Sequence, residues 1–387
     1  MKNLNFLLEN IFRANASYKL VESGNLSRLE QQALTGLLSD PEVYGVFKPG
    51  ATVSYDSYKV AYKDVALLWY SLQQPGTMPI FLRNIFDDDI NATLASLILD
   101  GILEIKYKGE FFSGPGAQQI IFKHDGEPGF SKNGKIASLS GKAIRYVFSL
   151  NHLDIRMLSA RLYAYNTMPG LKVQDILNTP KEVESFLGIG NYDYIDRAIL
   201  KNWVKHLPTE NFNWLIWQHK EDSNDLVNKV TYKMYISPAI YEMPKTFNRI
   251  VGELIKTKSF SFKVGADRHG LLRPDKFIAY FKSFSDLQEA ASMLKPLLQG
   301  VEVQGVPFTA QLDEEGLLSW GVDPPRKEVL ENFDGASWRA SVTDKIALAI
   351  SQAKTASLEN GAAYNFIMNK ISLEGIDPRT WISRLKV

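Results

Sequence analysis

The chain has 387 residues, 45% of them hydrophobic, so it is long enough to form two or three domains with their own cores. Its 44 basic and 43 acidic residues give a net charge of +1, which argues against bulk nucleic-acid binding and a polybasic membrane anchor. The absence of cysteine excludes disulfides, cysteine-ligated zinc, iron–sulfur clusters and a cysteine nucleophile.

The hydropathy pattern predicts a protein that does not enter a membrane. No window approaches the ~18 uninterrupted apolar residues of a membrane span. The N-terminal stretch "MKNLNFLLENIFRANASYKL" has Glu9 and Arg13 inside or beside its short apolar run, unlike the unbroken core of a signal peptide. We therefore expect a soluble cytoplasmic protein with neither a membrane nor a nucleic-acid partner.

Residues 1–115 are predicted to be a mainly helical region. Two helices are expected up to about residue 40, the second beginning at a capping box of Ser27 and Glu30. Three further helical patterns lie between residues 59 and 101, and the alternation in "ILEIKYKGEFFSG" predicts a β-hairpin around Lys108-Gly109. Helices followed by a two-stranded wing are typical of winged-helix segments.

Three functions remain open for this winged-helix-like segment. The first is peptide binding by strand addition, because "LASLILDGILEI" resembles the last helix of recognition domains in peptide-modifying enzymes. The second is a purely structural role. The third, DNA binding, is the least favoured, because the third helix is apolar and lacks Arg, Lys or Gln side chains that read base edges.

The middle region, residues 116–208, is predicted to be mainly helical and carries no motif with an assigned chemistry. "GFSKNGKI" at 129–136 is similar to a phosphate-binding loop, but Ile136 stands where a Ser or Thr would bind magnesium. In the region before it, three consecutive Asp residues in "FDDDIN", at 86–91, are more simply a helix N-cap than a metal site. We therefore expect no cofactor and no metal, and we place a domain boundary in "LPTENF" at 207–212.

Residues 209–387 are predicted to form an α+β domain. Strand-like runs such as "FNWLIWQHK", "VTYKMYISP", "SFSFKVG" and "DKFIAYF" come in pairs that alternate with single helices, and two shorter extended runs follow, "VPFTAQL" and "LLSWGV". This order is typical of a twisted, mostly antiparallel sheet with packed helices.

Basic and phenolic side chains recur on the polar positions of these strands. Lys233 and Tyr235 share one parity, and Lys263 is the polar residue of "SFSFKVG"; if the two strands are neighbours, all three line one open surface. Tyr280 and Lys276 share parity on the next strand. Further basic groups lie in the adjoining loops: Arg268, Arg273, His219 and Lys220.

This composition indicates a phosphate site, because cations and phenols converge without a carboxylate in the same motifs. Crowded ammonium groups lower one another's pKa, so a Lys placed here can act as a base. The alternative is that these residues are the solvated polar face of a half-exposed sheet.

The segment from about 212 to 380 resembles the HopA-type effector family, whose relatives occur beside kinases in clusters that make lanthipeptides and thioamidated peptides. The resemblance is carried by "KMYISPAIYEMPKTFNRIVGELI", "GVPFTAQLDEEGLLSWGVDPP" and "GIDPRTW". The order of motifs is also similar to that of phosphothreonine lyases among bacterial effectors, which have a "KFHIS"-like strand and a "KWKVT"-like strand.

The resemblance implies a role for each matching residue. Lys263 would remove the Cα proton, Tyr235 would replace the general-acid His, and Lys233 would bind phosphate. The match also implies phosphate-binding roles for Tyr280 and Arg339, for Arg268 or Arg273, and for His219 or Lys220.

The function implied by this resemblance is a phosphoserine/phosphothreonine lyase. It would eliminate phosphate from a ribosomally made precursor peptide, leaving dehydroalanine or dehydrobutyrine, after a separate kinase had phosphorylated the peptide. The alternative is a non-catalytic subunit that binds the phosphopeptide or the kinase.

Overall fold

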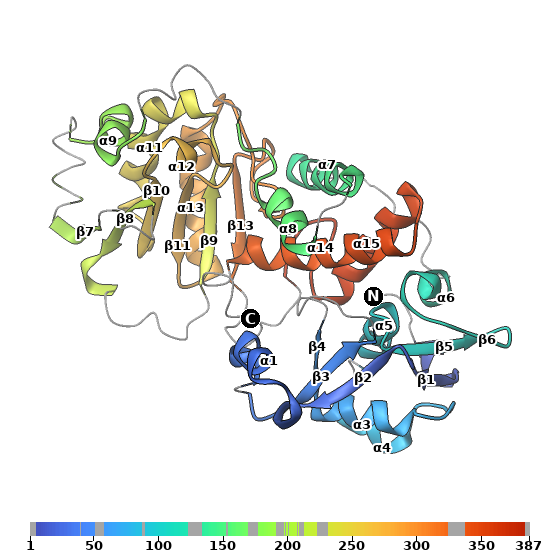
Figure 1. Cartoon of the computed structure of the whole chain (residues 1–387). Helices are drawn as coiled ribbons and strands as arrows, with labels where there is room; N and C mark the ends of the chain where they lie inside the picture. The colour runs from blue at the N-terminus through green and yellow to red at the C-terminus, as the bar shows by residue number, and fades with distance from the viewer. Residues whose placement is uncertain are drawn as a thin grey trace. The chain divides into compact units, whose positions relative to one another are not determined.

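The computed structural model of the chain has an α+β fold, which confirms the predicted class (Figure 1). The residues that it describes are 5–38, 40–50, 58–86, 90–122, 134–151, 154–168, 177–190, 197, 199, 201–206, 208, 213–222, 231–323 and 337–383.

The chain divides into two compact units. Unit 1 consists of Met1–Phe130, Phe148–Ser159 and Pro324–Pro378, and unit 2 consists of Ser131–Val147, Ala160–Asp323 and Arg379–Val387. The predicted link at 207–212 lies outside the described residues except for Pro208, and the three regions 1–115, 116–208 and 209–387 stay a prediction.

The first small sheet of unit 1 has the order β2-β3-β4 and is antiparallel. Two short helices connect its first two strands, and the predicted capping box is present, since Ser27 N donates to Glu30 Oε2 at 2.8 Å and Glu30 N donates to Ser27 Oγ at 3.4 Å. The bounds are β2 (Tyr18–Glu22), α1 (Arg28–Ala33), α2 (Thr35–Leu38), β3 (Val43–Pro49) and β4 (Lys59–Tyr62).

The helix predicted near the N-terminus is wrong. This segment contains the 3-10 helix η1 (Asn5–Glu9), the strand β1 (Phe12–Ala14) and then β2. β1 pairs with β5 and β2 pairs with β3, so distant strand partners outweigh the local apolar spacing.

The predicted helices and hairpin of the winged-helix-like segment are confirmed. The hairpin β5-β6 turns at Lys108 (φ 48°) and Gly109 (φ 94°), and β1 completes a sheet of order β1-β5-β6. The bounds are α3 (Lys63–Ser71), α4 (Ile80–Phe86), α5 (Ile90–Leu99), β5 (Leu103–Tyr107) and β6 (Glu110–Phe112). The three Asp residues read as an N-cap, 87–89, lie outside the described residues.

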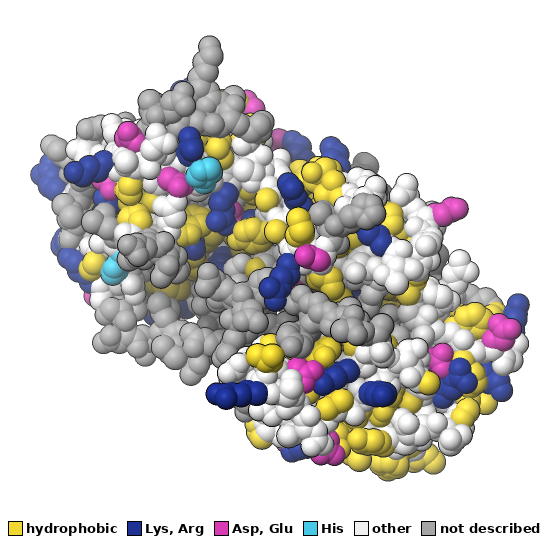
Figure 2. All heavy atoms as spheres, viewed as in Figure 1, with side chains coloured by type: hydrophobic (Ala, Val, Ile, Leu, Met, Phe, Trp, Pro, Cys, Tyr) yellow, Lys and Arg dark blue, Asp and Glu magenta, His cyan; other side chains and the backbone are white. Residues whose placement is uncertain are grey.

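Large apolar side chains are exposed on α3 and α4, where Figure 2 shows a yellow patch at the lower edge of the view. They are Leu67, Tyr70, Ile80, Phe81 and Ile85. Within the described residues, none of the helices combines the length and apolar character needed to cross a bilayer, and no group of three or more potential metal ligands occurs.

A buried charge cluster joins the last helix of unit 1 to its N-terminal half. Asp100, at the end of α5, accepts from Lys59 Nζ of β4 at 3.1 Å and from Lys370 Nζ of α15, and we call these three residues the Asp100 cluster. Burial alone raises the pKa of Asp100, but Lys370 and Lys59 outweigh it and hold that pKa well below its usual range. The helices of this part are α14 (Trp338–Thr355) and α15 (Asn360–Leu373).

Unit 2 is built on a seven-stranded antiparallel sheet with the order β12-β13-β9-β11-β10-β8-β7. β11 lies between β9 and β10. The prediction that these two strands are neighbours is therefore wrong. The bounds are β7 (Trp203–His206), β8 (Trp214–His219), β9 (Tyr232–Ile236), β10 (Ser261–Gly265), β11 (Phe277–Phe281), β12 (Ala310–Gln311) and β13 (Leu318–Val322).

One face of this sheet is an aromatic core covered by helices. Phe262 stacks on Trp217 and on Phe277, and Phe247 of α11 packs against both Trp217 and Phe277. The remaining helices that Figure 1 labels are α6 (Gln118–Ile121), α7 (Lys135–Ser149), α8 (Ile155–Tyr163), α9 (Pro180–Leu187), α11 (Met243–Leu254), α12 (Arg268–Leu272) and α13 (Phe284–Leu297).

Candidate active site

The strand register places the predicted lysines and tyrosines on the sheet face opposite the aromatic core. Lys263 pairs with Ile278, which pairs with Tyr235, and Tyr280 pairs with Lys233. Residues that pair across strands point to the same face, and so do residues two apart on one strand. The alternation in the sequence thus identified the shared face correctly, although the two lysines are separated by a whole strand.

Tyr280 lies between the two ammonium groups. Lys233 Nζ is 5.5 Å from the centre of the Tyr280 ring, and Lys263 Nζ is 5.7 Å from it. Lys263 Nζ is also 4.2 Å from the centre of the Trp214 ring, and Arg273 Cζ is 5.2 Å from the same ring. Two aromatic rings therefore hold three cations together, and we call Lys233, Lys263, Arg273, Trp214 and Tyr280 the cationic cluster.

Lys263 is the cation of this cluster with the strongest reason to lose its proton. Burial lowers its pKa to about 8, helped by the charges of Lys233 and Arg273 and opposed by Asp275 and Asp323. Among the described residues, its ammonium touches aromatic rings and has no hydrogen-bond or ion-pair partner. A partly buried amine in this state is neutral often enough near neutral pH to take a proton from a substrate.

The prediction that these cations have no carboxylate in the same motifs is wrong. Lys233 Nζ lies 2.6 Å from Asp323 Oδ2, at the end of β13. Arg273 donates to both carboxylate oxygens of Asp275, each at 2.9 Å. Asp275 stands in "DKFIAYF" itself, two residues after Arg273, whereas Asp323 reaches Lys233 from the end of another strand.

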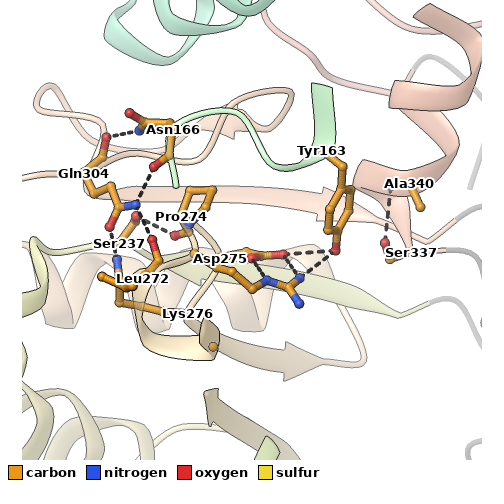
Figure 3. A network of polar contacts seen from close by, with 12 residues as sticks. Tyr163, Asn166, Ser237, Leu272, Pro274, Asp275, Lys276, Gln304, Ser337 and Ala340 are labelled. Carbon is orange, nitrogen blue, oxygen red and sulfur yellow. Dashed lines mark hydrogen bonds and ion pairs between the residues drawn. The ribbon is translucent and has the colours of Figure 1, made fainter. Parts of the chain in front are cut away.

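Asp275 fixes the direction of Arg273 and links it to Tyr163 at the end of α8. The Asp275 side chain is 2% exposed; Arg273 Nη2 donates to Tyr163 Oη at 2.9 Å, and Tyr163 Oη donates to Asp275 Oδ2 at 3.2 Å (Figure 3). Burial alone would lower the pKa of Arg273, but Asp275 and Tyr163 outweigh it and raise that pKa, so the guanidinium stays charged.

Lys276 supports the loop before β11 from the inside of unit 2. It is fully buried, and its Nζ donates to Pro238 O at 2.9 Å and to Gln304 Oε1. Gln304 Nε2 in turn donates to Leu272 O at 3.0 Å and to Asn166 O at 2.6 Å (Figure 3). Burial lowers the pKa of Lys276 to about 7 against the opposing charge of Asp275. The prediction that Lys276 lies on the open surface is therefore wrong. Its hydrogen bonds stabilise the segment that carries Arg273.

A close backbone approach shapes the other end of the same loop. A Cβ atom on Gly265 would lie 2.4 Å from the backbone carbon of Gly270, so only glycine fits where β10 ends against α12. Asp267 caps α12, since its Oδ1 accepts from Gly270 N at 2.7 Å. The turn from β10 into α12 is thus tightly determined.

Tyr235 shares the face of Lys263 but is sealed in the interior. Its side chain is 1% exposed and packs in a cluster with Ile278 and Val306. Ile278 lies between Tyr235 and Lys263 in the strand register. Trp214 and Tyr280, whose rings contact Lys263 Nζ, pack against this cluster.

The other predicted residues lie at the end of β8, on α12 and on α14. His219 is on the opposite face, edge-on to Trp203 at 5.4 Å between ring centres, and Lys220 Nζ donates to Lys201 O at 2.7 Å beyond the end of β8. Arg268, at the start of α12, contacts His269 at 3.4 Å. Arg339 is buried in α14 and belongs to unit 1.

Four residues of the site were missed from the sequence: Trp214, Asp275, Asp323 and Tyr163. Trp214 pairs with Gly265 and therefore shares the face of Lys263, but this follows from the pairing of β8 with β10 and not from alternation within "FNWLIWQHK". Tyr163 lies 110 residues before Arg273, and no local pattern links them.

Comparison with known proteins finds similar solved structures but no matching family or curated sequence. No protein-family model and no curated protein matches the chain. Its structure is similar to that of the effector protein from Pseudomonas syringae pv. syringae strain 61, at 12% identity and a TM-score of 0.37, over 64% of this chain and 98% of that one. It is also similar to the effector protein from Pseudomonas syringae pv. tomato strain DC3000, at 14% identity and a TM-score of 0.38, over 65% of this chain and 99% of that one.

Proposed function

We propose that the chain is a phosphoserine/phosphothreonine lyase that acts on a phosphorylated, ribosomally made precursor peptide. The observation that carries the proposal is the state of Lys263: burial lowers the pKa of its amine to about 8, and it stands unpaired, within the described residues, beside two other cations. A neutral amine is the base that β-elimination needs, and fixed cations suit a phosphate leaving group.

In this mechanism each of the three cations of the cationic cluster has a task. Lys263 takes the Cα proton, the Cα–H electron pair becomes the Cα=Cβ double bond, and the Cβ–O bond breaks toward the phosphate. Lys233 and Arg273 stabilise the negative charge of the departing group. Asp323 and Asp275 already balance part of their charge, and they hold both cations in fixed positions before the substrate arrives.

The partners follow from this chemistry. The substrate must arrive phosphorylated, so a separate kinase precedes this step, and the product is a peptide with dehydroalanine or dehydrobutyrine. The exposed apolar side chains of α3 and α4 are a surface on which a peptide or the kinase can pack.

A second candidate is a non-catalytic subunit that binds a phosphopeptide. It is favoured by the sealed position of Tyr235, which removes the proton donor implied by the resemblance. Both candidates use the cationic cluster, and only the first forms a new double bond.

We expect the full chain to convert synthetic phosphoserine and phosphothreonine peptides into dehydrated peptides. Mass spectrometry would detect loss of phosphoric acid, and addition of a thiol would label the new double bond, which a phosphatase product lacks. Lys263→Ala should lose this activity, and Lys258→Ala is its matched control, because the Lys258 side chain is 75% exposed and pairs with Asp286 on the surface. Phosphopeptides that bind and stay intact with a panel of flanking sequences would favour the binding subunit.

We also expect elimination to accelerate as the pH rises. The reactive form of Lys263 is the neutral amine, and its fraction grows as the pH climbs through about 8. Well below that pH, kcat/KM should rise about tenfold per pH unit, then level off above it. Initial rates measured from about pH 6 to about pH 9.5 check this profile. A rate that fell with rising pH over this interval would contradict Lys263 as the base.

A further inference from the structure

Two tyrosines on the face of Lys263 differ in exposure, although Tyr280 packs against the cluster that contains Tyr235. Tyr235 is 1% exposed and is packed against Ile278 and Val306. Tyr280 is half-buried, its ring lies between Lys233 and Lys263, and its hydroxyl has no hydrogen bond to any described residue. A phosphoryl group drawn to the two ammonium groups is thereby brought to the Tyr280 ring and not to Tyr235.

We propose, on the basis of the proposed lyase function, that Tyr280 is the catalytic residue that protonates the departing phosphate. The assignment replaces Tyr235 in that role and rests on position: Tyr280 is flanked by Lys233 Nζ at 5.5 Å and by Lys263 Nζ at 5.7 Å. A proton donor has to lie next to both the base and the leaving group, and Tyr280 is the phenol that meets this condition on the described face of the sheet.

Every proton in this step is accounted for without any other reactant. Lys263 Nζ accepts the Cα proton and becomes an ammonium, and the C–H electron pair forms the double bond. The electron pair of the breaking Cβ–O bond stays on the phosphate oxygen, and the Tyr280 hydroxyl gives that oxygen its proton, so hydrogen phosphate leaves. The Lys263 ammonium then returns a proton to the Tyr280 oxygen, directly or through water, and both side chains recover their starting forms.

The surroundings keep Tyr280 ready to donate. Burial raises its pKa well above the usual value for tyrosine, and the carboxylates Asp323 and Asp275 act in the same direction, so the phenol is protonated before the substrate binds. Lys233 is held by Asp323 at 2.6 Å, and Arg273 is held by Asp275, which leaves Tyr280 as the uncommitted hydroxyl between fixed charges.

The test compares two leaving groups in the full-length protein. A phosphoserine peptide needs its leaving group protonated, whereas a peptide of the same sequence with O-sulfoserine releases sulfate, a weak base that needs no proton. Tyr280→Phe should lower the elimination rate from the phosphopeptide by about 10²-fold or more, and should lower the rate from the sulfopeptide much less. Tyr241→Phe, on an exposed residue of the short helix Ile240–Glu242, is the matched control.

Each outcome decides one point. Equal losses on both peptides in Tyr280→Phe would overturn the assignment, and a loss confined to the phosphopeptide in Tyr235→Phe would return the role to Tyr235. If the wild-type protein does not accept the sulfopeptide, Tyr280→Ala with added imidazole replaces this comparison, and restored phosphopeptide elimination supports the assignment whereas no restoration opposes it. A wild-type protein that eliminates nothing from any phosphopeptide refutes the proposed function itself.

Discussion

Replacing Lys263 with methionine is expected to abolish elimination and, at the same time, to stabilise the fold. The first effect follows from losing the base, and removing a general base typically costs about 10²- to 10⁴-fold in rate. The second follows from the cost of burying the amine, because its pKa is lowered from 10.5 to about 8. A lowered pKa means that protonated Lys263 destabilises the folded state, and methionine, of similar length, removes this penalty.

The sign and size of the stability change follow from proton linkage. The unfolded chain binds the Lys263 proton more tightly than the folded chain, so the penalty is fully present below about pH 8 and disappears as the pH rises from there to 10.5. At pH 7 the variant should gain about 2–3 kcal/mol in free energy of unfolding, allowing for partial exposure of the site. Denaturant titrations at pH 7 and at about pH 10 measure the gain.

The matched control for that experiment is Lys258→Met. Lys258 is also a lysine of unit 2, but its side chain is 75% exposed and pairs with Asp286, so methionine there should give no gain in stability. If Lys263→Met is less stable than wild type at pH 7 while Lys258→Met is unchanged, burial of the protonated Lys263 amine does not destabilise the folded state. That result would also remove the main support for its role as a base.

Asp100→Ala is expected to be the most destabilising single substitution in unit 1. The change leaves the buried ammonium groups of Lys59 and Lys370 without their shared carboxylate. Breaking a buried ion pair by removing one partner typically costs about 3–5 kcal/mol, because an uncompensated charge remains in the interior. The same linkage predicts acid sensitivity, since the Asp100 pKa is held low and its contribution is lost as the pH falls toward that value.

Thermal and denaturant unfolding of Asp100→Ala would measure this loss. Glu42→Ala is the matched control: Glu42 pairs with Lys63 at 3.2 Å, but the side chains are 67% and 53% exposed, so the expected loss is within about 0.5 kcal/mol. A double variant, Asp100→Ala with Lys370→Met, should recover part of the stability. Failure of Asp100→Ala to destabilise more than Glu42→Ala would mean that the cluster carries no net folding energy.

The elements of unit 2 were largely predictable because each of its longer strands alternates clearly. "SFSFKVG" and "DKFIAYF" appear as β10 and β11, and the polar positions face one way as their alternation requires. Strand order was not predictable, because alternation describes one strand at a time and contains no information on its neighbours. The supposition that β9 and β10 are adjacent failed for this reason.

The candidate site was predictable in its cations and not in their partners. Lys233, Lys263 and Tyr280 can be recognised in the sequence as polar residues in apolar strands. Asp323 and Tyr163 instead reach the cluster from the end of β13 and the end of α8. The prediction of an N-terminal helix was wrong for a similar reason, because β1 and β2 are extended through pairing with strands later in the chain. Long-range pairing of this kind leaves no trace in local spacing.

The interrupted path of unit 1 has a consequence for synthesis on the ribosome. Its N-terminal sheets are made first, but Lys370 of the Asp100 cluster is supplied by a helix translated more than 200 residues later, after the whole of Ala160–Asp323. At about 5–20 residues per second, the 270 residues from Asp100 to Lys370 take roughly 14–54 s to translate, and the earlier segment waits for that time. During that time unit 1 lacks Lys370, the buried partner of Asp100, although the strands of the larger sheet are already translated.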